Sequence, residues 1–407
     1  MQCGLLGRVL GHSYSPLIHS YLGEYAYALY EKEPEQLEDF LKHGDFAGLN
    51  VTIPYKQAVI PYLDELSPIA RKLRAVNTIV RRPDGSLIGH NTDFYGFGAM
   101  LDRTGLCLQG KKALVLGTGG ASKPAISALQ ERGAQVVNVS RAGENNYHNL
   151  QNHADAALIV NATPLGMAPN TGASALSLEG FPRLEGVLDL IYNPARTKLL
   201  LEAESRGLKV ENGLWMLVAQ AWESAQWFTG SEIDPGKIPA IHSRIRRDVE
   251  NLILIGMPGC GKSTLGKALA KALNREFVDA DKALESQYGP IPEIFQKSGE
   301  PGFRPLETEV LGQLGKRSGL VIATGGGCIT RPENYPLLHQ NGRIFYIRRA
   351  LQSLTSAGRP LSQRVGAEAL YAARKPLYEQ FADYTVENNG SPEEAIREIL
   401  NIWEETP

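Results

Sequence analysis

The chain has 407 residues, which is too long for one ordinary domain and suggests two or three. Its apolar content of 43% is typical of a globular protein, and 42 basic residues nearly balance 44 acidic ones, so the composition gives no reason to expect a nucleic-acid or polyanion partner. No run of residues is apolar enough to span a bilayer, and the four cysteines are scattered without metal-binding spacing. We expect a cytoplasmic enzyme without a membrane partner.

A polar turn with two hydroxyl groups precedes the first predicted helix. Ser13 and Ser15 stand two residues apart in this turn, and Pro16 suits the first turn of the helix that follows. Either serine could cap the helix, and the residues alone leave open whether the pair binds a ligand instead.

Three polar residues then fall at or near the ends of predicted strands. A strand that includes Ile53 is expected to end at Pro54 and to bring Lys56 to its end, while a second strand contains the amide of Asn77. Asp93 follows a further strand and precedes a helix. A lone lysine in such a place is usually solvated surface, so these positions by themselves assign no chemistry.

A strand, a glycine turn and a helix begin near residue 113. The strand Ala113–Leu116 leads into a turn in which Gly117 and Gly119 match the pattern GxGxxG, with Ser122 in place of the third glycine. The next strand, Gln135–Val139, completes a βαβ unit. This setting predicts a dinucleotide-binding domain, although the glycine pattern alone would be weak evidence.

The end of that second strand bears on the choice of dinucleotide. An NAD site would carry an acid there for the ribose hydroxyls, whereas this chain has Ser140 and Arg141. An arginine suits a 2′-phosphate, so the sequence favours NADP over NAD. Glu144 lies close enough along the chain to keep NAD open as an alternative.

Two more strands, at 157–160 and 187–192, continue the predicted parallel sheet. Both end in polar loops, which are plausible walls for a cofactor because ligands of such sheets lie at the carboxyl ends of strands. A helix is expected from Asn212 to about Phe228, and a shorter one follows. The charged end of the shorter helix, at 243–248, is the best candidate for a linker.

The segment Gly256-Met-Pro-Gly-Cys-Gly-Lys262-Ser263-Thr264 is the most specific motif in the chain. It lies between the apolar run 252–255 and a helical pattern at 265–273, which is the setting of a GxxxxGK[ST] phosphate loop rather than of an ordinary turn. Glycine N–H groups suit phosphate oxygens, Lys262 can reach the outer phosphates, and Ser263 can ligate Mg²⁺. This part of the chain is predicted to bind a nucleoside triphosphate.

Charged residues follow the phosphate loop at regular spacings. A predicted strand at 276–281 ends in Asp279 and Asp281, which would share one face of the strand and could both point at a metal–phosphate site. Arg304 and Glu307 would fall on one face of a helix, where a surface ion pair is the alternative interpretation.

Further signals lie in the last ninety residues. Three glycines, Gly325–Gly327, follow the predicted strand 320–323 and allow a ligand to approach the backbone closely. The segment 358–361 is loop-like, as a mobile lid would be, and Arg374 adds a cation on a helix.

Two families are recognisable from these segments. Residues 1–245 resemble shikimate dehydrogenase in seven segments, namely His12–Pro16, Asn50–Lys56, Ala75–Thr78, Asn91–Asp93, Gly117–Ser122, Asn161–Thr163 and Asn212–Gln220. Residues from 249 onward resemble shikimate kinase in the phosphate loop and in Asp279–Asp281, Gly299–Glu307, Gly325–Gly327, Arg359–Leu361 and Arg374–Tyr378.

The resemblance implies an α/β protein with an α/β substrate domain, a Rossmann-type NADP domain, and a P-loop kinase domain of α/β/α form with a parallel sheet. The dehydrogenase part would cover 1–245, with a substrate subdomain at about 1–100 and 214–245 and an NADP subdomain at about 101–213. The kinase part would cover 249–407.

By resemblance, the first part would reduce 3-dehydroshikimate to shikimate with NADPH. Lys56 and Asp93 would form the catalytic pair beside the reacting oxygen. The substrate would be held by Ser13, Ser15, Thr52, Asn77, Asp93, Tyr192 and Gln220. The dinucleotide would be bound by Gly117, Gly119, Gly120, Ala121, Ser122, Ser140, Arg141, Thr163 and Gly213.

By resemblance, the second part would phosphorylate the shikimate 3-hydroxyl with ATP. Asp281 and Lys262 would be its catalytic residues, the first at the hydroxyl and the second at the phosphates. The substrate would be held by Asp281, Arg304, Gly326 and Arg374. ATP would be bound by Gly259, Cys260, Gly261, Lys262, Ser263, Thr264 and Arg359, and Mg²⁺ by Ser263 and Asp279.

Three positions depart from the family patterns. Asn145 stands near the place of a second arginine that would bind the 2′-phosphate, Trp215 replaces a glycine, and the lid before Arg359 is short and lacks an arginine usual in the kinases. Two other functions are therefore weighed against a bifunctional enzyme. One is a sensing regulator built from inactive copies of both folds, which would be expected to have lost the catalytic groups, and the other is a dehydrogenase that prefers quinate and NAD.

Overall fold

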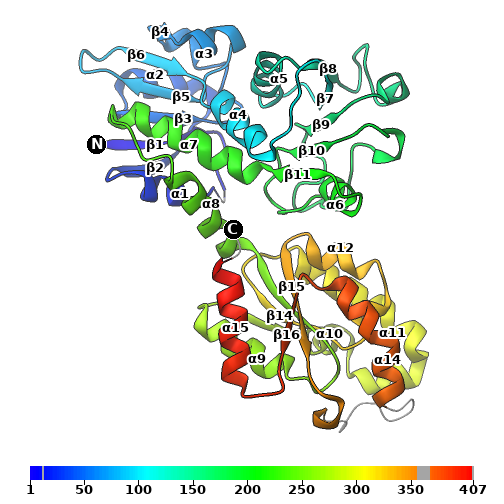
Figure 1. Cartoon of the computed structure of the whole chain (residues 1–407). Helices are drawn as coiled ribbons and strands as arrows, with labels where there is room; N and C mark the ends of the chain where they lie inside the picture. The colour runs from blue at the N-terminus through cyan, green and yellow to red at the C-terminus, as the bar shows by residue number, and fades with distance from the viewer. Residues whose placement is uncertain (12, 355–366, 406–407) are drawn as a thin grey trace. The chain divides into compact units, whose positions relative to one another are not determined.

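The computed structural model describes residues 1–11, 13–354 and 367–405 (Figure 1). Packing divides the chain into two compact units. Unit 1 consists of Met1–Tyr192 and Leu199–Ser243, and unit 2 consists of Asn193–Lys198 and Arg244–Pro407. Each unit has its own hydrophobic cores and its own sheet or sheets.

Unit 1 begins with a mixed six-stranded sheet in the order β2-β1-β3-β5-β6-β4. Its strands are β1 (Gln2–Gly7), β2 (Ala26–Glu31), β3 (Gly48–Val51), β4 (Glu65–Leu66), β5 (Thr78–Arg81) and β6 (Leu87–His90). β1 pairs parallel with β2 and β3, whereas β5 pairs antiparallel with β3 and β6. The helices that follow these strands are α1 (Ser15–Leu22), α2 (Leu37–His43) and α3 (Pro68–Leu73).

The second sheet of unit 1 is entirely parallel, with five strands in the order β11-β10-β9-β7-β8. These strands are β7 (Lys112–Leu116), β8 (Gln135–Val139), β9 (Leu158–Asn161), β10 (Gly186–Asp189) and β11 (Lys209–Asn212). Alternate residues of β7 enter two different cores, Ala113 and Val115 on one face and Leu114 and Leu116 on the other. Because both faces are covered, the strand is a continuous apolar run, as the sequence predicts.

The other helices of unit 1 are α4 (Asp93–Thr104), α5 (Ser122–Glu131), α6 (Lys198–Ser205) and α7 (Gly213–Thr229). α8 (Lys237–Val249) begins in unit 1 and ends in unit 2. α4 packs along α7, and both carry predicted site residues. The predicted helix from Asn212 is confirmed, because the Asn212 side chain caps α7 by accepting from the backbone N–H of Leu214 at 3.0 Å. The expected linker at 243–248 is helical throughout, since it forms the end of α8.

Unit 2 contains a parallel sheet of five strands in the order β13-β14-β12-β15-β16. The strands are β12 (Asn251–Ile255), β13 (Phe277–Asp279), β14 (Val321–Ala323), β15 (Gly342–Arg348) and β16 (Tyr384–Glu387). The helices are α9 (Lys262–Ala272), α10 (Ala280–Tyr288), α11 (Ile291–Gly315), α12 (Asn334–His339), α14 (Ala367–Phe381) and α15 (Pro392–Glu405).

Helices cover both faces of the unit 2 sheet, as Figure 1 shows for α9 and α15 on one side and α11 and α14 on the other. Leu252 and Leu254 of β12 face the core with α9 and α15, and Ile253 and Ile255 face the other core. The α/β class and the parallel sheets predicted from the sequence are therefore confirmed. Among the described residues, no helix combines the length and the apolar character that a bilayer-spanning segment needs.

Two predicted strands end earlier than expected. β3 stops at Val51, and Ile53 lies outside it with an exposed side chain, because the backbone N–H of Tyr55 bonds to the Thr52 carbonyl at 2.9 Å and closes a turn. β13 stops at Asp279, so Asp281 lies in the first turn of α10 rather than on the strand. The prediction that the two aspartates share one face of a strand is therefore wrong, although both residues line the same cavity.

Candidate active sites

The predicted lysine–aspartate pair of unit 1 is formed. Lys56 lies in the turn after β3, and Asp93 is the first residue of α4, where the helix N-terminus favours a carboxylate. The Lys56 Nζ donates to the Asp93 Oδ2 at 2.6 Å, with only 18% and 10% of the two side chains exposed. The pairing keeps a charged ammonium in a largely buried place, where an unpaired charge would be costly.

A network of amides and hydroxyls lies next to Asp93 in the chain. The Asn77 Nδ2 donates to the Thr92 Oγ1 at 3.1 Å and lies 3.5 Å from the Gln220 Oε1, and the backbone N–H of Thr92 donates to the Asn77 Oδ1 at 2.7 Å. The structure therefore brings together two predicted substrate residues, one beside β5 and one from α7. Thr92 was missed as a site residue, although it stands between two residues of the segment Asn91–Asp93 that carries the resemblance.

The polar turn before α1 has a role in the backbone as well as a predicted role in binding. The Ser13 Oγ accepts from the backbone N–H of Ser15 at 3.2 Å, while the N-cap residue itself is Tyr14, whose side chain makes no capping bond. Ser15 is buried at the start of α1. The Tyr14 and Tyr192 rings lie 5.8 Å apart, so this turn and the segment after β10 come together.

The glycine turn after β7 lies against the lysine of the pair. A Cβ added to Gly120 would lie 3.8 Å from the Lys56 Cδ, whereas one added to Gly119 would meet nothing within 4 Å. Gly117 has φ +105°, and its Cβ would lie 2.9 Å from the Thr163 Cγ2, so a side chain there would be strained and crowded. The turn therefore presents open backbone beside Lys56, which is what a bound dinucleotide requires.

Ser122 explains how the pattern works without its third glycine. Its side chain is buried at the start of α5, and its hydroxyl donates to the Gly119 carbonyl at 2.7 Å. The hydroxyl therefore ties the helix to the turn. Ala121 is the N-cap residue between them.

The residues predicted to select the dinucleotide lie just beyond β8. Ser140 donates its backbone N–H to the Asn145 carbonyl at 3.0 Å, and Arg141 is exposed. An exposed arginine at this strand end fits a 2′-phosphate. Gly213 serves packing as well, because a Cβ there would lie 2.1 Å from the Leu190 carbonyl oxygen.

Trp215, which replaces a glycine of the family pattern, has a packing role. The Arg103 guanidinium of α4 lies 4.2 Å from the centre of one of its rings, and the His242 ring of α8 lies 5.1 Å away. The indole thus joins three helices of unit 1 through a cation–π contact and a tilted aromatic contact. The sequence offered no way to expect this.

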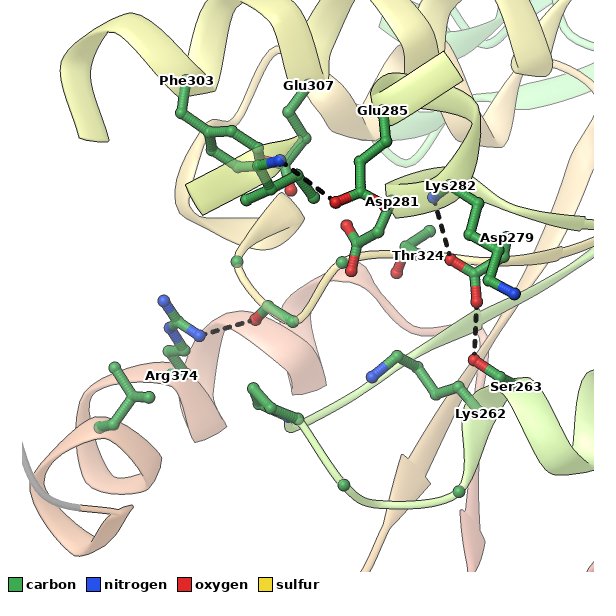
Figure 2. A pocket seen from close by; sticks show the side chains of 18 of the residues that line it. Lys262, Ser263, Asp279, Asp281, Lys282, Glu285, Phe303, Glu307, Thr324 and Arg374 are labelled. Carbon is green, nitrogen blue, oxygen red and sulfur yellow. Dashed lines mark hydrogen bonds between the residues drawn. The ribbon is translucent and has the colours of Figure 1, made fainter. Parts of the chain in front are cut away.

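Unit 2 has a cavity of about 840 Å³ at the carboxyl ends of β12, β13 and β14 (Figure 2). Every described residue that was predicted to bind in this unit lines it, except Cys260, which is buried. The predicted residues on its wall are Gly259, Gly261, Lys262, Ser263, Thr264, Asp279, Asp281, Arg304, Gly326 and Arg374. Arg359 lies outside the described residues.

The phosphate loop forms one side of this cavity. The Lys262 Nζ donates to the carbonyls of Gly256 and Met257 at 2.8 and 3.1 Å, so the lysine is held by its own loop. The Ser263 Oγ donates to the Asp279 Oδ2 at 2.8 Å, as Figure 2 shows. A hydroxyl and a carboxylate in contact suit a hard cation, and Mg²⁺ takes its remaining ligands from phosphates and water.

The opposite side of the cavity contains a buried ion pair. The Arg304 Nη1 donates to the Glu307 Oε2 at 2.7 Å, and only 10% and 5% of these side chains are exposed. Burial raises the pKa of Glu307 despite the opposing effect of Arg304, and the negative charge of Asp281 raises it further. The alternative of a surface ion pair is therefore wrong.

The three glycines after β14 make room for side chains of this site. A Cβ at Gly325 would lie 2.6 Å from the Asp281 Oδ1 and 2.8 Å from the Glu307 Oε1, and one at Gly327 would lie 2.2 Å from the Arg304 Nη2. The turn therefore brings the backbone against charged groups from two helices. The sequence had indicated only the approach of a ligand.

The carbonyl of Gly326 is held by two donors from α14. The Arg374 Nη1 donates to it at 3.0 Å, and the Tyr378 Oη donates to it at 2.5 Å. Burial raises the pKa of Tyr378 well above its ordinary value, so the phenol keeps its proton. Arg374 thus reaches the cavity on a helix, as predicted.

Several residues on the cavity wall were not predicted from the sequence. They are Pro258, Lys282, Glu285, Ile291, Pro292, Phe295, Phe303, Thr324, Arg349, Ser353 and Leu370, together with Glu307, whose pairing with Arg304 was predicted but not its place on the wall. Glu285 follows Asp281 by four residues, so the correct assignment of α10 would have placed these two side chains on one face of the helix.

Comparison with known proteins shows which families the two parts of the chain resemble. Two family models match it, the shikimate dehydrogenase substrate binding domain over residues 5–79 and shikimate kinase over residues 258–404. A relative from Clostridium perfringens (strain SM101 / Type A), named shikimate dehydrogenase (NADP(+)), is 36% identical over 265 residues, which cover 60% of this chain and 97% of that protein. The chain belongs to the shikimate dehydrogenase family. It carries a shikimate kinase domain in addition.

Solved structures of shikimate dehydrogenases are similar to the same 60% of the chain. The shikimate 5-dehydrogenase of Thermus thermophilus in complex with NADP(H) and shikimate is 34% identical, is covered over 99% of its length, and gives a TM-score of 0.54. A chorismate mutase/shikimate 5-dehydrogenase fusion protein from Clostridium acetobutylicum is 35% identical, is covered over 96%, and gives a TM-score of 0.57. A shikimate dehydrogenase joined to a second enzyme in one chain is therefore seen elsewhere.

The short distances from Gly325 to Asp281 and Glu307 make a substitution at this glycine a test of the kinase site. We expect Gly325→Ala to lower kinase kcat/KM by at least about tenfold, because the added methyl group would push Asp281 and Glu307 from their positions. The dehydrogenase rate of the same protein should be unchanged. Kinase and dehydrogenase assays on one preparation measure both effects.

Gly312→Ala is the matched control for this substitution. Gly312 lies inside α11, and its added Cβ would meet Leu337 at ordinary contact distances of 3.6 and 3.7 Å. Equal kinase rates in the two variants would show that the crowding at Gly325 does not matter for the site.

Proposed function

We propose that this chain catalyses two consecutive reactions. Unit 1 reduces 3-dehydroshikimate to shikimate with NADPH, and unit 2 phosphorylates shikimate to shikimate 3-phosphate with ATP. The observation that carries this proposal is that each unit retains a buried, paired cation beside a glycine backbone, Lys56 with Asp93 and Arg304 with Glu307. We further propose the domain limits 1–245 and 249–407, with the first divided into a substrate part (about 1–100 and 214–245) and an NADP part (about 101–213).

In unit 1, Lys56 and Asp93 would act on the oxygen of the reacting carbonyl. The reduced nicotinamide supplies hydride when it is bound. As negative charge develops on the oxygen, the Lys56 ammonium can stabilise it and donate a proton, and Asp93 holds the ammonium in place at 2.6 Å. Placement of the substrate would come from the predicted set of Ser13, Ser15, Thr52, Asn77, Tyr192 and Gln220.

The dinucleotide of unit 1 would lie on the glycine turn and the end of β8. The open backbone of Gly119 and Gly120 suits the pyrophosphate, and Arg141 suits the 2′-phosphate. Preference for NADP is supported by the C. perfringens relative, which is named for NADP(+), and by the Thermus structure, which contains NADP(H). Further contacts would come from Gly117, Ala121, Ser122, Ser140, Thr163 and Gly213.

In unit 2, phosphoryl transfer would depend on positioning and charge. Asp281 would orient the shikimate hydroxyl or accept its proton, while Arg304, Arg374 and the Gly326 backbone would hold the acid. Lys262 would leave the loop carbonyls that it now contacts and bind the outer phosphates of ATP. Ser263 and Asp279 would hold Mg²⁺, directly or through water.

Cellular location is also part of the proposal. Both families consist of metabolic enzymes. We place the enzyme in the cytoplasm, where its small-molecule substrates would be its partners.

A single coupled assay tests the whole function. Purified full-length protein given 3-dehydroshikimate, NADPH, ATP and Mg²⁺ should form NADP⁺, ADP and shikimate 3-phosphate. Replacing NADPH with NADH, or 3-dehydroshikimate with dehydroquinate, should lower the rate and so separate this enzyme from a quinate dehydrogenase. A protein that binds both nucleotides but leaves the acids unchanged would instead be the sensing regulator.

The roles of the two units can be separated by substitution at Lys56. Lys56→Ala should lower reductase kcat by about 10²- to 10⁴-fold, because the proton donor at the carbonyl is lost. Kinase activity should remain within about twofold. Lys72→Ala, which removes an exposed lysine paired with Glu131 on the surface, is the control and should leave both rates unchanged.

Asp281 gives the converse prediction in unit 2. Asp281→Asn should lower kinase kcat by about 10²-fold or more, since the amide cannot accept the proton of the hydroxyl. ATP affinity, measured by titration calorimetry, should change little because Asp281 is not expected to touch the nucleotide. Unchanged turnover would remove Asp281 from the mechanism.

A further inference from the structure

Glu300 makes the most exposed contact with the arginine that we propose as the carboxylate binder of unit 2. It lies at the start of the second half of α11, directly after Gly299, where the helix is interrupted by a residue with φ +65°. Its Oε1 accepts from the Arg304 Nε at 3.0 Å and from the Arg304 Nη2 at 2.5 Å. No residue-level function was predicted for Glu300 from the sequence.

Each edge of the Arg304 guanidinium has a neighbour in this structure. The Nη1 side is taken by Glu307, and the Nε/Nη2 side is taken by Glu300. The far end lies against the backbone of Gly327, where an added Cβ would be 2.2 Å from Nη2 and 2.4 Å from Nη1. A planar carboxylate binds an arginine best along an edge that offers two N–H groups. The edge that meets this requirement and is not closed by backbone is the one that Glu300 occupies.

Of the two carboxylates, Glu300 is the one that can leave. Its side chain is 41% exposed, whereas that of Glu307 is 5% exposed. Moving Glu300 into water costs little, because a partly exposed ion pair contributes little to stability. Moving Glu307 away would leave a buried charge without its partner.

We propose that Glu300 is an internal carboxylate that occupies the substrate's place on Arg304 and is displaced when the substrate binds. This inference rests on the proposed function, since it needs Arg304 to bind the carboxylate of shikimate. Arg304 then has two carboxylate partners both before and after binding, Glu307 with Glu300 and Glu307 with the substrate. Glu300 therefore lowers the apparent affinity for the acid and acts as a determinant of specificity rather than as a catalytic residue.

The test is the Glu300→Gln variant of the full-length protein, assayed as a kinase with shikimate and saturating ATP without NADP(H). We expect KM for shikimate to fall about 3- to 10-fold with kcat within about twofold, because an amide holds the guanidinium less strongly than a carboxylate. With the neutral methyl ester of shikimate as substrate, the substitution should leave KM unchanged. Glu398→Gln, which makes the same charge change at an exposed position of α15, should leave KM for shikimate unchanged.

The opposite result is equally measurable. If Glu300 served to orient Arg304, Glu300→Gln would raise KM for shikimate, and an unchanged KM would also overturn the proposal. ATP binding by the same preparation, measured by titration calorimetry, shows that unit 2 of the variant is folded. Arg304→Lys separates this inference from the function on which it rests. If the lysine variant keeps wild-type KM for shikimate, the role of Arg304 is wrong. If it loses shikimate binding while Glu300→Gln fails to lower KM, only the role of Glu300 is wrong.

Discussion

A cation paired with a carboxylate against a glycine backbone is the arrangement on which both sites depend. Lys56 is held by Asp93 beside the turn that contains Gly120, and Arg304 is held by Glu307 against Gly327. In each case a charged side chain lies in a place with little water, and its ion-pair partner offsets most of the free-energy cost of desolvation. At Gly327 a side chain would occupy the space that the guanidinium needs, whereas a Cβ at Gly120 would only touch the Lys56 Cδ at 3.8 Å.

Parallel sheets explain why such groups gather where they do. In unit 2 the phosphate loop with α9, the start of α10 and the three-glycine turn follow β12, β13 and β14, whose carboxyl ends meet at one edge, while α11 and α14 add the arginines. In unit 1 the glycine turn follows β7 in the same way, while Lys56 and Asp93 lie in the segments that follow β3 and β6 of the mixed sheet. The sheets therefore determine where the site residues lie, and the segments that follow the strands carry the reactive groups.

Much of this could be predicted from the sequence because the signals are local. The phosphate loop has a fixed pattern between an apolar strand and a helix, and β12 and α9 are found there. The strand Gln135–Val139 is observed with the predicted bounds, and α7 begins after its asparagine cap. Apolar runs, caps and glycine patterns depend on neighbouring residues, so one sequence is enough to read them.

The rest consists of local patterns that the sequence analysis missed and of contacts that form only in the folded chain. The sequence pattern predicts that Asp281 is part of a strand. Instead, the side chain of Asp279 accepts from the backbone N–H of Lys282, and a helix starts at Ala280. Thr92 gains its place through Asn77, and Glu300 through the edge of Arg304 that the fold leaves reachable. The contact of Thr92 arises only once the elements are packed, whereas the cap of α10 and the pairing of Glu300 at i, i+4 are local patterns that residue types and spacing could have supplied.

One consequence follows from the presence of units 1 and 2 in a single polypeptide. Each round of translation produces one copy of each catalytic unit. The ratio of the two catalysts is therefore fixed and cannot be adjusted by separate gene expression. Balance between the two steps must then come from the turnover rates themselves. A slow second step would let the intermediate acid accumulate whatever the amount of protein made.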